Sequence, residues 1–250
     1  MTMDRLTRTV REQVALGRLL PLGGPDDPVW ITENAAVLAL RGAADGMRGV
    51  RLRDVDVVLV DAGGAPSVPP AAPVGALPHL PVRIEAEFDA AADEPLPVTA
   101  ERLRDVLWEA AGPRLGLVVA AVDLQVSGLL DDGPPAPGGP LEGRVLDPEP
   151  EPGPALVEPG SAEAVAAAAR AVPGVRRLTR RLAGLGPGIR VRDDTAEGRS
   201  PSRHVQAQIA TGPGHLPLAV ARAVAVAIAD AAAPGAPGPV TSAVVVTDVG

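Results

Sequence analysis

The stretch DDGPPAPGGPLEGRVLDPEPEPGPALVEPG, residues 131–160, divides the chain into two parts and so decides how the fold is organised. Proline and glycine make up half of this stretch, and its acidic residues far outnumber its one arginine. A segment of this kind buries too little apolar surface to fold alone, and proline favours an extended backbone. We therefore predict a linker over residues 133–158, between a first module at 1–132 and a second module at 159–250.

The first part shows the order helix, strand, strand, helix, strand. Leu103, Val106 and Leu107 recur at helical spacing, and the stretch VRIEAEF alternates apolar and polar side chains as a half-buried strand does. A proline-rich stretch at 61–81 is predicted to be a long surface loop. The predicted elements span residues 31–50, 55–60, 82–88, 94–112 and 118–129.

The second part repeats this order. Its helices are predicted at 161–175 and 216–232, and its strands in the arginine-rich segment after Gly174 and at 188–194, 204–210 and 242–249. Three matched positions, Gly49 with Gly174, Leu96 with Leu216 and Val122 with Val244, lie 120 to 125 residues apart. Nearly constant offsets of this kind indicate internal duplication. The prediction is an α+β fold of two similar α-β-β-α-β modules.

An amphipathic helix is predicted at the N-terminus. In DRLTRTVREQVALGRLL, Leu6, Val10 and Val14 recur every four residues, with most of the arginines off that stripe. We expect this helix to dock on its own domain. The alternative is a helix lying on a membrane surface, although its apolar face carries no aromatic residue.

The order of elements resembles the alkaline-shock-protein family of bacterial envelope-stress proteins. The resemblance rests on Gly49-Val50, the strand 82–88, the helix 98–111, LGL at 115–117 and VDLQVSGL from Val122. It covers residues 30–130 and, more loosely, 161–250. It implies small non-enzymatic modules that assemble and attach to the inner membrane through a partner, and no catalytic residues. The chain also resembles high-GC actinobacterial proteins, some of which carry a nucleopolyhedrovirus P-ten-like label.

Composition narrows the function classes. The formal net charge is −8 and every basic residue is arginine, so a global nucleic-acid-binding footprint is absent. Because the chain has no cysteine, disulfides and thiolate metal sites are excluded. The most apolar run, from Leu216, is too short to cross a bilayer, so no transmembrane segment is predicted. We expect a cytoplasmic protein, with contact at the inner face of the membrane through a partner as an alternative.

Motifs for catalysis and cofactor binding are missing from the sequence. Without lysine or cysteine the chain has no phosphate-loop lysine, Schiff-base lysine or thiol nucleophile, and no serine lies in a nucleophile elbow. The glycines of GLGPGIR lack dinucleotide-loop spacing, and no two of His79, His204 and His215 have zinc-helix spacing. We predict no catalytic, cofactor or metal site, and therefore a protein that is not an enzyme.

Two surfaces remain as candidates. The helix from Pro217 is apolar nearly all round, so it and the matching helix suggest a protein contact or self-association surface, made of Trp108, Val224, Val226 and Ile228. The leading hypothesis is therefore a structural or adaptor protein linked to envelope stress or homeostasis. The alternative is a regulatory module that binds nucleic acid or an anionic surface through a basic patch of Arg176, Arg177, Arg180 and Arg181. A charge run of this kind more often covers the solvated side of an edge strand.

Overall fold

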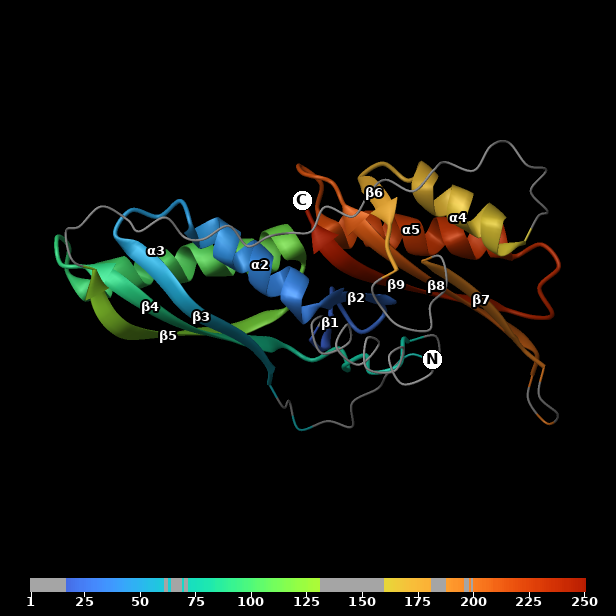
Figure 1. The fold of residues 1–250 in the computed structure, drawn as a ribbon. Coiled ribbons are helices and arrows are strands. Elements are labelled where there is room, and N and C mark those ends of the chain that lie inside the picture. The colour runs from blue at the N-terminus through green and yellow to red at the C-terminus, as the bar shows by residue number, and fades with distance from the viewer. Residues whose placement is uncertain are drawn as a thin grey trace, which may run out of the picture.

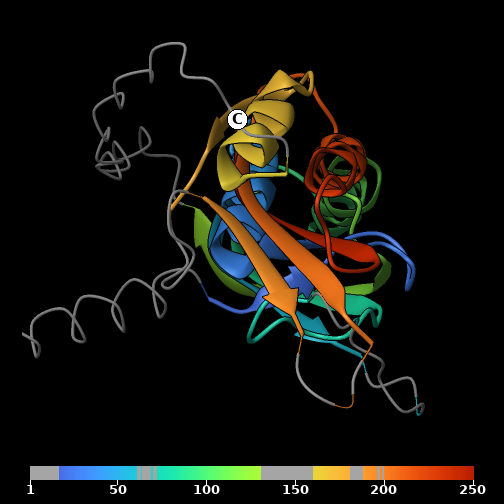
Figure 2. The ribbon, with the colours of Figure 1, turned by 90° about the vertical axis from the view of Figure 1, so that its right-hand side faces the viewer.

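The structure is a computed structural model that describes residues 17–60, 63, 69, 72–130, 160–180, 188–195, 198 and 200–250. It contains two sheets, each with helices on one face, and the predicted α+β class is confirmed. The two sheets lie end to end, and all the labelled helices cover the same side of them (Figure 1). In the view along the long axis, α4 and α5 lie above the second sheet (Figure 2).

The first sheet has the order β3-β4-β5. Strand β3 pairs antiparallel with β4, and β4 pairs parallel with β5. Its helices pack against the alternating apolar side chains that the sequence predicted, with Ile84 and Phe88 fully buried. The elements are α2 (Glu33–Ala44), β3 (Val50–Leu59), β4 (Val82–Ala91), α3 (Leu96–Glu109), the π-helix η1 (Ala110–Leu115) and β5 (Val119–Leu130).

The second sheet has the order β1-β2-β9-β8-β6, with β7 also paired to β8. Strand β8 pairs antiparallel with β6 and β7, and parallel with β9. Its own helices and strands are α4 (Ala162–Ala171), β6 (Val175–Leu178), β7 (Ile189–Asp194), β8 (Ser202–Thr211), α5 (Pro217–Ala232) and β9 (Val240–Val249). The order α4, β6/β7, β8, α5, β9 repeats that of the first sheet.

Two strands from the start of the chain complete the second sheet. Strands β1 (Leu19–Pro21) and β2 (Val29–Thr32) pair with each other, and β2 pairs parallel with β9. This corrects two predictions. The helix expected from residue 31 begins at Glu33, because Thr32 is extended and caps it by accepting a hydrogen bond from the Ala35 amide. Residues 19–32 also join the sheet of the second module, although the sequence placed them with the first. The end of the predicted N-terminal helix is not helical, because Leu19 and Leu20 lie in β1. Residues 4–16 of that predicted helix lie outside the described residues, as does the predicted linker at 133–158.

One hydrophobic core runs through both halves. It includes Leu40 of α2, Phe88 of β4, Ile31 of β2 and Val246 of β9. A second, smaller cluster lies on the sheet face away from the helices, where Ala72 and Ala76 cover Trp30 and Val245. The described end of the long loop at 61–81 therefore packs under the second sheet, rather than standing free as a surface loop.

None of the helices in the described parts of the chain is long and apolar enough to span a membrane.

Candidate functional site

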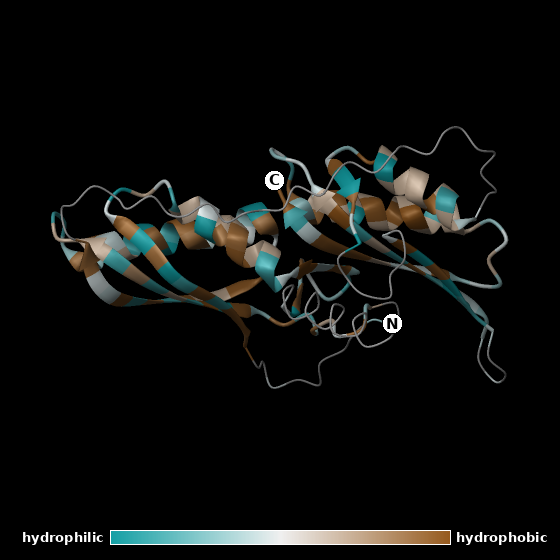
Figure 3. Cartoon of the chain, viewed as in Figure 1, coloured by the Kyte–Doolittle hydropathy of each residue, from teal (hydrophilic) through white to brown (hydrophobic). Residues whose placement is uncertain are grey.

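Of the four residues predicted to form a contact surface on α3 and α5, two are exposed and two are buried in the core. Trp108 on α3 is 44% exposed and Val226 on α5 is 63% exposed, whereas Val224 and Ile228 are fully buried. The prediction that Val224 and Ile228 lie on a contact surface is therefore wrong. Helix α5 is apolar nearly all round (Figure 3) because it packs against both α4 and the strands β8 and β9, so it buries more than one stripe within its own module.

The two halves of the chain meet through β2, which pairs with β9, and through α2, which packs on both β3 and β9. Helix α5 meets η1, where the side chain of Leu218 lies against Gly116, whose φ is +94°. A β-carbon at Gly116 would lie 2.6 Å from Leu218, so this close approach requires glycine.

A groove of about 280 Å³ lies between α2 and α3. It is lined by Ala43 of α2, by Asp105, Val106 and Glu109 of α3, and by Arg114 of η1. Trp108 is exposed next to Glu109 on α3, but it is not one of the residues that line this groove. An exposed tryptophan bordered by polar side chains is typical of an anchor residue in protein interfaces.

The predicted basic patch lies at a sheet edge. Arg176 and Arg177 are exposed on β6, and Arg177 forms an ion pair with Asp248 of β9 at 3.0 Å. Arg180 is exposed just after β6 and interacts with another residue, and Arg181 lies outside the described residues. Binding of nucleic acid or an anionic surface through these arginines stays a prediction.

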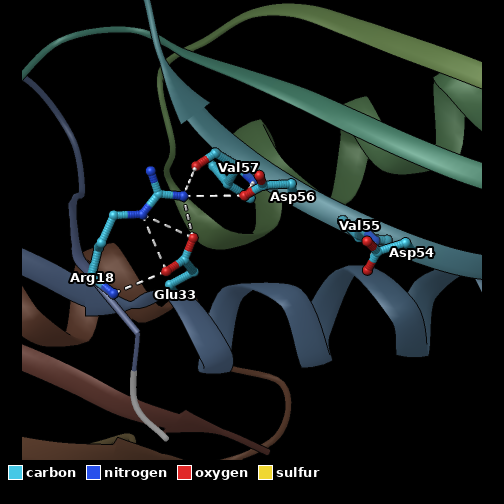
Figure 4. Close-up of polar contacts among 6 residues, drawn as sticks. All are labelled: Arg18, Glu33, Asp54, Val55, Asp56 and Val57. Atoms are coloured by element: carbon cyan, nitrogen blue, oxygen red, sulfur yellow. Dashed lines mark hydrogen bonds and ion pairs between the residues drawn. The ribbon is translucent and has the colours of Figure 1, made fainter. Parts of the chain in front are cut away.

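Two ion pairs at the junction of the modules are not indicated by any pattern in the sequence. Arg222 of α5 forms a bidentate ion pair with Asp27, with N–O distances of 2.6 and 2.7 Å. Arg18 forms a similar pair with Glu33 at the start of α2, and also donates to Asp56 and to the Val57 carbonyl of β3 (Figure 4). No local motif marks these residues, because their partners are distant in the sequence.

These contacts shift the pKa values of their carboxyl groups. Hydrogen bonds from Arg222 lower the pKa of Asp27 below its ordinary value of 3.8. Burial acts to raise the pKa of Glu33, but hydrogen bonds from Arg18 outweigh it, so that pKa lies below 4.5. Burial also lowers the pKa of His79, whose ring lies edge-on to Trp30 at 5.2 Å, although the nearby Asp27 acts in the opposite direction.

We expect acid to weaken the junction. A carboxyl whose pKa is lowered by folding stabilises the folded state above its unfolded pKa and loses this effect as the pH falls through the folded value. Stability should therefore fall below about pH 4 as Asp27 and Glu33 take up protons.

Arg222→Leu should lower the free energy of unfolding by about 0.5–1 kcal/mol at pH 7 and make the fall on acidification shallower. Urea unfolding between pH 7 and pH 3 measures both, and equal pH slopes in the two proteins would contradict the assignment.

The histidines do not come together. His204 of β8 shares a 2.6 Å hydrogen bond with Thr241, and His79 lies under the second sheet near Trp30. His215 precedes α5, where its ring lies near Gly174. Among the described residues, no group of three or more His, Asp or Glu side chains could hold a metal ion. The described polar groups join strands and helices within the chain.

In comparisons of the chain with protein-family models, with curated proteins and with solved structures, nothing matched.

Proposed function

We propose that the chain is a non-enzymatic structural or adaptor protein, made of two alkaline-shock-like modules that arose by duplication. It acts through protein contacts in the cytoplasm, with the inner face of the membrane within reach through a partner. Its role is linked to envelope stress or homeostasis, as the resemblance implies.

The matching details of the two modules support the duplication. Both modules have an antiparallel strand pair followed by a parallel pair. Both first helices begin after a hydroxyl cap, Thr32 in α2 and Ser161 in α4. Each last strand carries one extra residue at the matching place, Ser127 in β5 and Thr247 in β9. Bulges tend to be kept in related proteins, so a shared bulge favours a common origin.

Exposure of Trp108 is the observation that carries the adaptor proposal. The chain has two tryptophans, one phenylalanine and no tyrosine, and both Trp30 and Phe88 are fully buried. Trp108 is thus the one tryptophan or phenylalanine ring left at the surface. Burying an indole of this kind against a partner contributes strongly to affinity.

We expect Trp108→Ser to abolish partner binding without unfolding the chain. The full chain would be cross-linked in cells of its native host, and each captured protein then purified and titrated against the wild type and the variant. Affinity should fall at least about tenfold for Trp108→Ser and stay unchanged for Val74→Ser, a matched control at a fully exposed apolar position outside the predicted contact surface. Acrylamide quenching of Trp108 should fall when the partner binds. A partner that binds both variants equally, and leaves the quenching unchanged, would contradict the proposal.

A further inference from the structure

The sheet edges of this protein differ in how they are protected. An exposed edge strand invites pairing with another chain, and proteins prevent this with charges, bulges or very short strands. Four of the ten residues of β3 are charged, as are four of the six residues of β7 and two of the four residues of β6. Strand β1 has three residues, and its Leu19 is bridged by Ala76.

Strand β5 is neither short nor rich in charge, and its only protection of these three kinds is a bulge at Ala120 and another at Ser127. It is twelve residues long, it forms one edge of the first sheet, and Asp123 is its single charged residue. Its surface is apolar, because Val126 is 39% exposed, Leu129 is 62% exposed and the adjoining Val118 is 46% exposed. The composition of β5 is that of a strand with neighbours on both sides, yet β4 is its one partner strand among the described residues.

In the second sheet, the edge that corresponds to that of β5 is paired with another strand. Strand β9 holds the position of β5, and its outer edge is paired with β2 through Val244, Val245 and Val246. Judged from the shared bulge, Val126 corresponds to Val246, which is fully buried. The same alignment pairs Val244 with Leu124, so the predicted match of Val244 with Val122 is wrong by two residues. The edge that β2 covers on β9 is covered by no strand on β5 in the part of the chain that the structure describes.

The main-chain groups on that edge can be assigned. The Val122 carbonyl accepts a hydrogen bond from Nε of Arg104 at 3.2 Å. It therefore points to the side of β5 that faces away from β4. Alternate residues of a strand direct their main-chain groups to the same side, so Leu124 and Val126 present theirs at the open edge. In β9, the corresponding amide of Val244 donates to the Pro28 carbonyl of the added segment.

We propose that β5 pairs antiparallel with β5 of a second copy of this chain, across a two-fold axis at Gln125. Strand β5 is the one long, apolar edge strand in the described parts of the chain, so a second copy supplies a strand of matching character. In this register Leu124 faces Val126 of the other copy, and Asp123 faces Ser127. No like charges oppose each other, whereas an axis at Asp123 would oppose two carboxylates. The result is a continuous six-stranded sheet with an isologous interface.

This contact uses main-chain groups of the β5 edge, whereas the adaptor proposal uses the indole of Trp108. The two proposals fail separately, because dimerisation is measured as the mass of the full chain and adaptor binding as the affinity for a captured partner.

Charge exchange at Gln125 tests the register. Gln125 is exposed on the strand, so its replacement leaves the fold of one copy unchanged. The full chain should dimerise in light scattering coupled to size exclusion. Gln125→Asp and Gln125→Lys should each be monomeric alone, because the axis brings two like charges together, and an equal mixture of the two should restore the dimer. Val58→Asp, which adds the same charge to the opposite edge strand, should leave the dimer intact.

A cysteine at the same position provides a second readout. Residues opposed without hydrogen bonds in an antiparallel pair have Cα atoms about 4.5 Å apart, which a disulfide can span. Because the chain has no cysteine, Gln125→Cys should form a single cross-linked dimer under mild oxidation, and Val58→Cys should not. The proposal is overturned if the wild type is monomeric at high concentration, or if its dimer is unaffected by Gln125→Asp. A strand of another protein found on β5 would likewise replace the second copy as the occupant.

Discussion

Residues 159–250 produced alone should aggregate or self-associate, and residues 1–132 should return them to solution. Separation removes β2 from β9, which leaves the main-chain groups of Val244 and Val246 without their partner strand. It also exposes the apolar side chains that pack against Val29 and Ile31, both of which are fully buried in the intact chain. An unpaired apolar strand is prone to non-native pairing. Co-expression followed by size exclusion should recover a soluble complex of the two fragments.

A matched variant shows whether the rescue depends on β2. Residues 1–132 carrying Ile31→Asp should fail to rescue, because a carboxylate would enter the core beside Val246 at the cost of its hydration. The same fragment carrying Leu38→Asp, which alters an exposed position on α2, should rescue normally. If residues 159–250 are soluble and monomeric alone, β2 is not an essential part of the second sheet.

Periodic segments allowed most of the fold to be predicted. Val82, Ile84, Ala86 and Phe88 alternate with charged residues, and all four face the helices in β4. Helix α5 begins at Pro217, and Pro97 is the second residue of α3, and at both positions the missing amide costs nothing. These features are local, so the sequence contains the whole signal for them.

Strand β2 could not be predicted because its signal is not local. Its four residues follow Pro28 and lead directly into α2, and their partner is the last strand of the chain. A run as short as Val-Trp-Ile-Thr has no period of its own, and the apolar pattern of α2 extends across it. The same limit explains Arg222 and Asp27, whose ion pair joins residues 195 positions apart.

The candidate surface was predicted in part for a related reason. The sequence indicated that Trp108 and α5 carry more apolar surface than a single stripe requires, and Trp108 and Val226 are exposed. The sequence could not show that Val224 and Ile228 are buried in the core, because their burial depends on α4 packing against α5 within the same module. Hydrophobic excess on a helix identifies a second contact without saying whether the contact is internal or with another chain.

Truncating the two tryptophans should lower the free energy of unfolding by very different amounts. Trp30 is fully buried between β1 and β9, and its Nε1 donates to the Leu77 carbonyl at 3.0 Å. Trp30→Ala should lower the free energy of unfolding by about 3–5 kcal/mol, since it leaves a cavity under the second sheet. Trp30→Phe keeps most of the apolar volume, so the loss should be nearer the value of about 1 kcal/mol for one hydrogen bond.

Trp108→Ala is the matched control, because it removes the same side chain from an exposed helix position and should change stability by no more than about 0.5 kcal/mol. Urea unfolding followed by circular dichroism measures all three variants in the full chain. The expected order of stability is Trp108→Ala, then Trp30→Phe, then Trp30→Ala. The loop around Leu77 should also become more open to proteases in Trp30→Ala, because Trp30 belongs to the cluster against which Ala72 and Ala76 pack and donates to the Leu77 carbonyl. Equal destabilisation by Trp30→Ala and Trp108→Ala would mean that the small core around Trp30 does not hold this loop against the second sheet.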